Sequence, residues 1–143
     1  PDLESRVAEI TAASTEAAAA LKAVERQLAE MAVLIKDVTT CKELRPLIQE
    51  YQRAVDKKQF RRKHEGALIL YEAAAKALKE QGLQKLPDLY ALKAEYKQLT
   101  EQKAQLQRQY NDAKRQTQEY GIIKQNVDGI LRTTPEKEQK QER

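Results

Sequence analysis

The sequence predicts an all-α protein, an elongated antiparallel helical coiled coil with a short helical head. Two long stretches, 2–44 and 87–131, place apolar residues at alternating steps of three and four, which is the heptad pattern of a helix that packs against another helix. Charged residues make up 34% of the chain and aromatic residues only 5%, a composition typical of coiled coils. The intervening segment, 45–86, is long enough to turn the chain around, so we expect the two stretches to pair antiparallel within one chain.

The longest predicted helix covers 87–131. Pro87 suits the first helical position, where the missing N–H costs nothing, whereas Gly121 and Gly129 lower the helix propensity of the last turns. A helix of this length extends for about 65–70 Å, which no single core of this size requires, so it needs a partner helix. Its predicted seam contains Leu89, Leu92, Tyr96, Leu99, Lys103, Leu106, Tyr110, Ala113, Thr117, Tyr120, Lys124, Val127 and Leu131.

The partner is the first predicted helix, 2–44. Small residues at 14–20 allow close approach of a neighbouring helix, to which Tyr110 and Tyr120 offer complementary bulk. The apolar stripe widens at 31–35, and a wide stripe needs more than one partner helix. We therefore expect two-helix packing near residue 10 and three-helix packing near residue 33. The predicted seam contains Leu3, Val7, Ile10, Ser14, Ala17, Leu21, Val24, Leu28, Met31, Ile35 and Val38.

The head is predicted to contain two shorter helices, 47–55 and 57–81. Arg45-Pro46 is expected to end or kink the first helix, because the residue before a proline avoids helical angles. The helix 47–55 carries Leu47, Ile48, Tyr51 and Val55 on one face.

Start and stop signals delimit the helix 57–81. Asp56 is the predicted N-cap, and Val55 and Phe60 occupy the two positions of a hydrophobic staple. Gly82 suits a left-handed C-terminal cap, with Leu83 folding back on Leu78.

These elements form one predicted domain, 1–131, followed by a polar tail, 132–143, that contains Pro135 and is expected to fray. We also expect Leu28 and Leu34 to contact the 87–100 half of the last helix or the helix 57–81.

The residue inventory argues against catalysis, a metal site or a cofactor. The chain has one His and one Cys and no glycine-rich phosphate loop. His64 has no second histidine at metal-ligand spacing, so we expect it to be partly buried on the Leu68-Tyr71 stripe. Cys41 is expected to be a passive small apolar residue, and a single cysteine fits a reducing, cytoplasmic compartment. No apolar run approaches the length of a membrane span, so no membrane insertion is expected.

The charge distribution singles out one cluster. The net charge is +4, too modest to imply nucleic acid by itself. Residues 57–63 contain five bases and no acid: Lys57, Lys58, Arg61, Arg62 and Lys63. This basic run is either a solvated face or a patch that binds phosphate or carboxylate groups. Contacts to nucleic acid would be to the backbone and insensitive to sequence.

The order of several motifs resembles the C-terminal region of relaxases, the mobilization nucleases of conjugative and mobilizable elements. The similar stretches are Gln27 to Leu34, Phe60 to Leu78 with the run HEGALILYEAAAKAL, Leu86-Pro87 followed by Leu92 to Tyr96, and Val127 to Leu131 within KQNVDGIL. Each stretch alone is ordinary helical sequence, and the resemblance rests on their order and spacing over nearly the whole chain.

The resemblance implies a non-catalytic appendage. Relaxases cut one DNA strand at a transfer origin with a tyrosine nucleophile and a metal held by a histidine cluster, and both belong to an N-terminal catalytic domain that this chain does not resemble. The first residue, Pro1, agrees with a piece of a longer protein. The implied role is assembly of the DNA-transfer complex, through contacts with its proteins and with the DNA backbone.

A second interpretation stays open, namely a generic coiled-coil scaffold or oligomerisation module unrelated to DNA.

Overall fold

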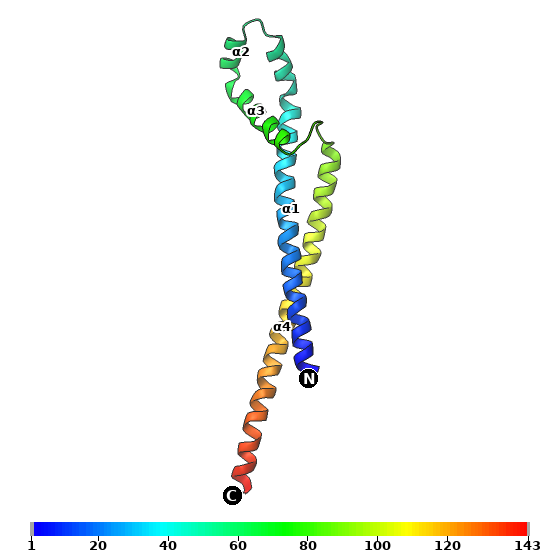
Figure 1. Ribbon diagram of the computed structural model, residues 1–143, viewed down its shortest axis with the longest axis vertical. Helices are drawn as coiled ribbons and strands as arrows, with labels where there is room; N and C mark the ends of the chain where they lie inside the picture. Colours follow the sequence, from blue (N-terminus) through cyan, green and yellow to red (C-terminus); the bar gives the residue numbers. More distant parts are fainter. Residues whose placement is uncertain (1, 143) are drawn as a thin grey trace. The chain divides into compact units, whose positions relative to one another are not determined.

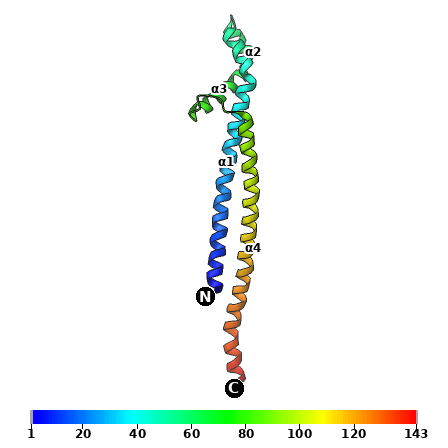
Figure 2. The same cartoon turned by 90° about the vertical axis from the view of Figure 1, so that its right-hand side faces the viewer.

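The computed structural model describes the backbone of residues 2–142 and the side chains of residues 2–131. It confirms the all-α fold class, with helices α1 (Asp2–Arg53), α2 (Lys57–Lys63), α3 (Glu65–Glu80) and α4 (Leu89–Glu142) and no strand in that part of the chain. Figures 1 and 2 show α1 and α4 as unbroken helices. The chain divides into two compact units, one formed by Pro1–Glu25 with Glu101–Arg143 and the other by Arg26–Thr100. The prediction of a single domain over 1–131 stays a prediction.

In the first unit, the start of α1 packs antiparallel against α4 (Figures 1 and 2). On α1 the predicted seam residues Ile10, Leu21 and Val24 are buried. On α4 the predicted seam from Lys103 to Lys124 is half-buried, while most residues between its positions are exposed. The small residues of α1 lie opposite the seam of α4 in a groove of about 330 Å³, which is lined by Ala13, Glu16, Ala17, Ala20, Leu106, Gln109 and Ala113.

In the second unit, three helices meet at one hydrophobic core. Val38 and Cys41 of α1, Ala74 and Leu78 of α3, and Leu92 of α4 are buried together. Leu34 packs against this cluster, as do Ile35, Tyr71, Ala75, Leu83 and Leu89. The widening stripe of α1 therefore does mark three-helix packing, although Val33 within it remains 54% exposed.

The prediction that the first helix ends at Arg45-Pro46 and is followed by a separate helix 47–55 is wrong, because α1 continues through Pro46 to Arg53. A proline inside a helix removes one hydrogen bond, to the carbonyl four residues earlier. Both flanks of Pro46 are held by other contacts. Val38 and Cys41 are in the core, and the Tyr51 ring packs edge-on against Phe60, with 5.7 Å between ring centroids.

The single helix predicted for 57–81 is instead divided at His64, whose φ of −123° and ψ of 27° lie outside the helical region. The backbone hydrogen bonds continue through the break, from the His64 N–H to the Phe60 carbonyl and from the Leu68 N–H to the His64 carbonyl, each 3.0 Å long. The bend allows an ion pair that a straight helix would not. Arg61 reaches Glu72, and residues eleven apart on a straight helix are separated by about 16 Å along its axis, which two side chains do not bridge.

The predicted caps are mostly confirmed. The Asp56 carboxylate accepts a hydrogen bond from the Gln59 N–H at 3.0 Å. After α3, Gly82 adopts a φ of +79°, and the N–H groups of Gly82 and Leu83 donate to the carbonyls of Lys79 and Leu78, the hydrogen-bond pair of a Schellman motif. The prediction of a hydrophobic staple between Val55 and Phe60 is wrong, because Val55 is fully exposed.

The long helix begins at Leu89 rather than at Pro87. Asp88 is the N-cap of this helix, because its carboxylate accepts a hydrogen bond from the Tyr90 N–H at 3.1 Å, as N-cap carboxylates do. The helix is unbroken over the rest of the predicted 87–131 range, through Gly121 and Gly129, and its backbone is helical to Glu142. The side chains of 132–143 lie outside the described residues, so the expectation of a frayed tail stays a prediction.

Candidate functional site

Two surfaces of the second unit are candidate sites. One is the basic run, made by Lys57, Lys58, Arg61, Arg62 and Lys63, and the structure places all five on α2. The other, which we call the α1–α4 groove, is lined by Gln27, Glu30, Met31, Leu34, Gln81, Glu95 and Leu99.

The end of α2 at Lys63 changes the electrostatics expected for the basic run. Arg61, Arg62 and Lys63 form the last turn of α2 rather than the middle of a long helix. Cations at a helix C-terminus interact favourably with the helix dipole, while Lys57 and Lys58 in the first turn oppose it. The break at His64 therefore removes part of the electrostatic cost of crowding five cations.

Arg61 differs from the other cations because it is paired. Its two terminal nitrogens donate to the two carboxylate oxygens of Glu72 on α3, at 2.7 and 3.1 Å. This hydrogen bonding, more than charge attraction, lowers the pKa of Glu72. Arg61's own pKa is raised, first by Glu72 and then by a hydrogen bond with Tyr51. A carboxyl group with a lowered pKa stabilises the fold above its ordinary pKa, and that contribution disappears as the pH falls through the lowered value.

The other four cations face solvent. Lys57, Lys58, Arg62 and Lys63 are exposed, and no hydrogen bond or ion pair joins them to another described side chain. Lys58 and Arg62 also line a shallow hollow of about 230 Å³ with Arg61 and Glu65. These four charges are available to an anionic partner, whereas Arg61 is engaged inside the head.

Phe60, the only aromatic residue in the basic run, is held within the fold. Its ring lies 4.5 Å from the His64 ring and 5.7 Å from the Tyr51 ring, centroid to centroid. His64 itself is half-buried, as expected. A ring packed in this way does not offer a stacking platform for nucleic-acid bases, so the basic run presents charge alone.

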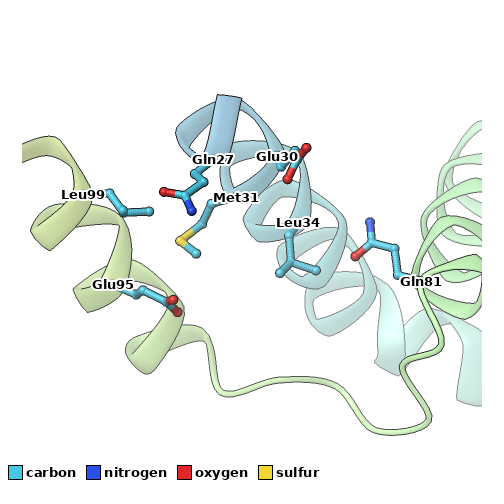
Figure 3. Close-up of a pocket in the computed structure, with 7 residues that line it drawn as sticks. All are labelled: Gln27, Glu30, Met31, Leu34, Gln81, Glu95 and Leu99. Atoms are coloured by element: carbon cyan, nitrogen blue, oxygen red, sulfur yellow. The ribbon is translucent and has the colours of Figure 1, made fainter. Parts of the chain in front are cut away.

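The α1–α4 groove has an apolar floor and a volume of about 620 Å³. Figure 3 shows Met31 and Leu34 of α1 and Leu99 of α4 pointing into the space between the two helices. All three side chains are half-buried, so each keeps apolar surface open to solvent. The chain that follows Gln81 crosses toward α4 beside the groove (Figure 3).

The rim of the α1–α4 groove is polar and acidic. Glu30 lies on the α1 side and Glu95 on the α4 side, with Gln27 and Gln81 nearby (Figure 3). Within the described part of the chain, none of these four side chains has a hydrogen-bond or ion-pair partner, and no basic residue lines the groove. Sequence reasoning missed this site. The sequence did contain a signal for this groove, namely the apolar stripe at 31–35, which is wider than the helices packed against α1 cover.

The buried cysteine is part of the core rather than of either surface. Burial raises the pKa of the Cys41 thiol, and the neighbouring Asp37 carboxylate raises it further, so the thiol stays protonated at neutral pH. One Asp37 carboxylate oxygen, Oδ2, is itself buried without a hydrogen-bond partner. A protonated, buried thiol is a poor nucleophile, in line with the passive role expected for it.

Two other kinds of feature are absent from the described residues. No group of three His, Cys, Asp or Glu side chains among them is arranged to hold a metal ion. None of their helices is both long and apolar enough to cross a lipid bilayer.

Comparison with known proteins adds no relative. No protein-family model, no curated protein and no solved structure matches the chain. The resemblance to relaxases therefore stays a prediction from the sequence motifs.

Proposed function

We propose that this chain is an interaction region without catalytic activity of its own, the C-terminal helical region of a relaxase, which serves the assembly of a DNA-transfer complex. The observation that carries the DNA part of the proposal is the unpaired charge on α2. Four exposed cations, Lys57, Lys58, Arg62 and Lys63, lie on two turns of helix. Such a cluster suits phosphate groups of a nucleic-acid backbone, which are bound through charge without regard to base sequence.

The paired Arg61 supports this assignment by its geometry. Its bidentate contact with Glu72 joins α2 to α3 across the bend at His64. Because the bend sets the direction of α2 relative to α3, it also sets the orientation of the four exposed cations on α2. The proposal assigns DNA-backbone contact to those four residues and a positioning role to Arg61.

A gel-shift titration tests the DNA contact. We expect the chain to shift duplex or single-stranded DNA at about 50 mM salt. If four phosphates are neutralised, affinity for duplex DNA should fall about 100-fold between about 50 and 200 mM salt. Replacing Lys57, Lys58, Arg62 and Lys63 with Gln should abolish the shift while the helical circular-dichroism signal is unchanged.

The matched control replaces four exposed lysines elsewhere in the second unit, Lys76, Lys79, Lys93 and Lys97, with Gln. It removes the same charge and should retain most of the DNA binding. Equal losses in the two variants, or no shift of the wild-type chain at about 50 mM salt, would exclude the basic run as a DNA site.

The relaxase assignment has its own test, in the gene that encodes this chain. A histidine cluster and a tyrosine nucleophile encoded upstream of this region would support it, and an unrelated upstream sequence would contradict it.

The scaffold interpretation, with no link to DNA, is the second candidate. The α1–α4 groove favours it, because an open apolar floor is a feature of protein-binding surfaces. A chain that fails to bind DNA and still binds a protein segment in this groove would be a scaffold.

A further inference from the structure

We propose that the α1–α4 groove binds a helical protein segment that carries aliphatic anchors flanked by lysine or arginine. The inference deepens the proposed role in assembly by naming a class of partner. It uses none of the residues of the basic run, so it can fail or succeed separately from the DNA contact.

The floor of the groove fits aliphatic side chains. Met31, Leu34 and Leu99 present half-buried apolar surface from two facing helices. A volume of about 620 Å³ is within the range of sites that hold a ligand or several side chains. Methionine is unbranched and adapts its shape to different anchors, so the floor can accept more than one aliphatic pattern.

The length of the groove fits two turns of helix. On the α1 side it extends from Gln27 to Leu34, about 10 Å along the helix axis. An amphipathic helix that enters a groove presents anchors at spacings of three, four and seven residues, and the span of seven residues is also about 10 Å. The partner therefore inserts two or three anchors.

The rim selects the charge of the partner. Glu30 and Glu95 stand on opposite sides of the floor, neither has a partner among the described residues, and no base lines the groove. Two carboxylates without counter-charges attract lysine or arginine beside the anchors and repel acidic residues and phosphate. The Gln27 and Gln81 amides lie at the same rim and can hydrogen-bond to polar groups of the bound segment.

The test uses Met31, the only methionine in the sequence, as a reporter in the groove floor. In the full chain labelled with ¹³C at the methionine methyl group, Met31 gives a single resonance that shifts when the groove is occupied. The probe is a 14-residue peptide with leucines at helical spacing and lysines elsewhere. We expect it to shift the Met31 methyl resonance saturably. A peptide with glutamates in place of the lysines, and one with serines in place of the leucines, should leave it unchanged.

A pair of protein variants separates the rim from general charge attraction. Glu30→Gln with Glu95→Gln should weaken binding of the leucine–lysine peptide about threefold to tenfold, the range for two exposed ion pairs. The control, Glu43→Gln with Glu50→Gln, removes the same charge from exposed positions of α1 outside the groove and should bind the peptide almost as the wild type does.

Three results would overturn the proposal. They are no shift of Met31 at millimolar leucine–lysine peptide, an equal shift with the glutamate or the serine peptide, and equal weakening in the two double variants.

Discussion

At the residue scale, two glycines of the second unit have opposite roles. Gly82 adopts a φ of +79° at the end of α3, a conformation that residues with a Cβ atom rarely adopt. Gly66 lies inside α3, and a Cβ atom added there would have no atom within 4 Å. The same substitution is therefore expected to have opposite effects at the two positions.

We predict that Gly82→Ala lowers the free energy of unfolding by about 1–2 kcal/mol, the cost of the left-handed conformation for an L-residue. Gly66→Ala should raise it by up to about 1 kcal/mol, because alanine has the higher helix propensity. Urea titrations followed by circular dichroism measure both. Stabilisation by Gly82→Ala would mean that the Schellman turn is absent in solution.

At the element scale, α1 shows that contacts elsewhere in the chain override a local signal. Pro46 lies inside a 52-residue helix, and the break comes instead at His64, in a stretch without proline. In the first case flanking contacts on both sides maintain the helix, and in the second the Arg61–Glu72 pair requires a bend. The same contacts decide which surfaces the head displays.

If Pro46 is tolerated rather than required, Pro46→Ala should stabilise the chain. It restores an N–H donor inside α1, and we expect a gain of about 1–3 kcal/mol in the free energy of unfolding. Thermal melts of the variant and the wild type give the answer. A loss of stability would show that the proline ring or a kink at this position is needed for the contacts of Cys41 or Tyr51.

At the scale of the whole molecule, one heptad phase organises the packing in both units. The predicted seam residues of α1 between Leu3 and Val38 are all buried or half-buried, and so are those of α4 from Leu89 to Lys124, except Tyr96 at 37% exposed. Val127 and Leu131, which continue the α4 seam, are exposed. Most of the seam is half-buried rather than buried, so each position contributes a moderate amount to the free energy of unfolding.

We predict that Leu99→Ala and Leu106→Ala, one in each unit, each lower the free energy of unfolding by about 1–3 kcal/mol, below the range for fully buried leucines. Gln102→Ala and Gln109→Ala at exposed positions of the same helix should change it by less than about 0.5 kcal/mol. Thermal melts of the four variants compare them directly. Equal shifts for leucine and glutamine variants would mean that the heptad phase is wrong.

Local signals were sufficient for several features that depend on residues close together in the chain, although the local predictions of a staple at Val55 and of a helix start at Pro87 were wrong. Helix periodicity depends on neighbours three and four positions apart, so the seam of α1 was predicted residue by residue and that of α4 was predicted except at Tyr96, Val127 and Leu131, which are exposed. The Asp56 cap and the Gly82 turn involve neighbours within five residues, and both were predicted. The basic run was predicted from composition alone.

Features that depend on distant residues needed the tertiary structure. Contacts to either side of Pro46 accompany the continuation of α1, and the break at His64 goes together with an ion pair between residues eleven apart. Only the fold showed that Glu72 engages one cation of the basic run and leaves four exposed. The α1–α4 groove exists because segments around Met31 and Leu99 come together. The sequence by itself determined the two long helices and their apolar faces, since these follow from local spacing. The tertiary structure decided the bends, the ion pair and the groove, since each requires groups that are far apart in the chain to meet.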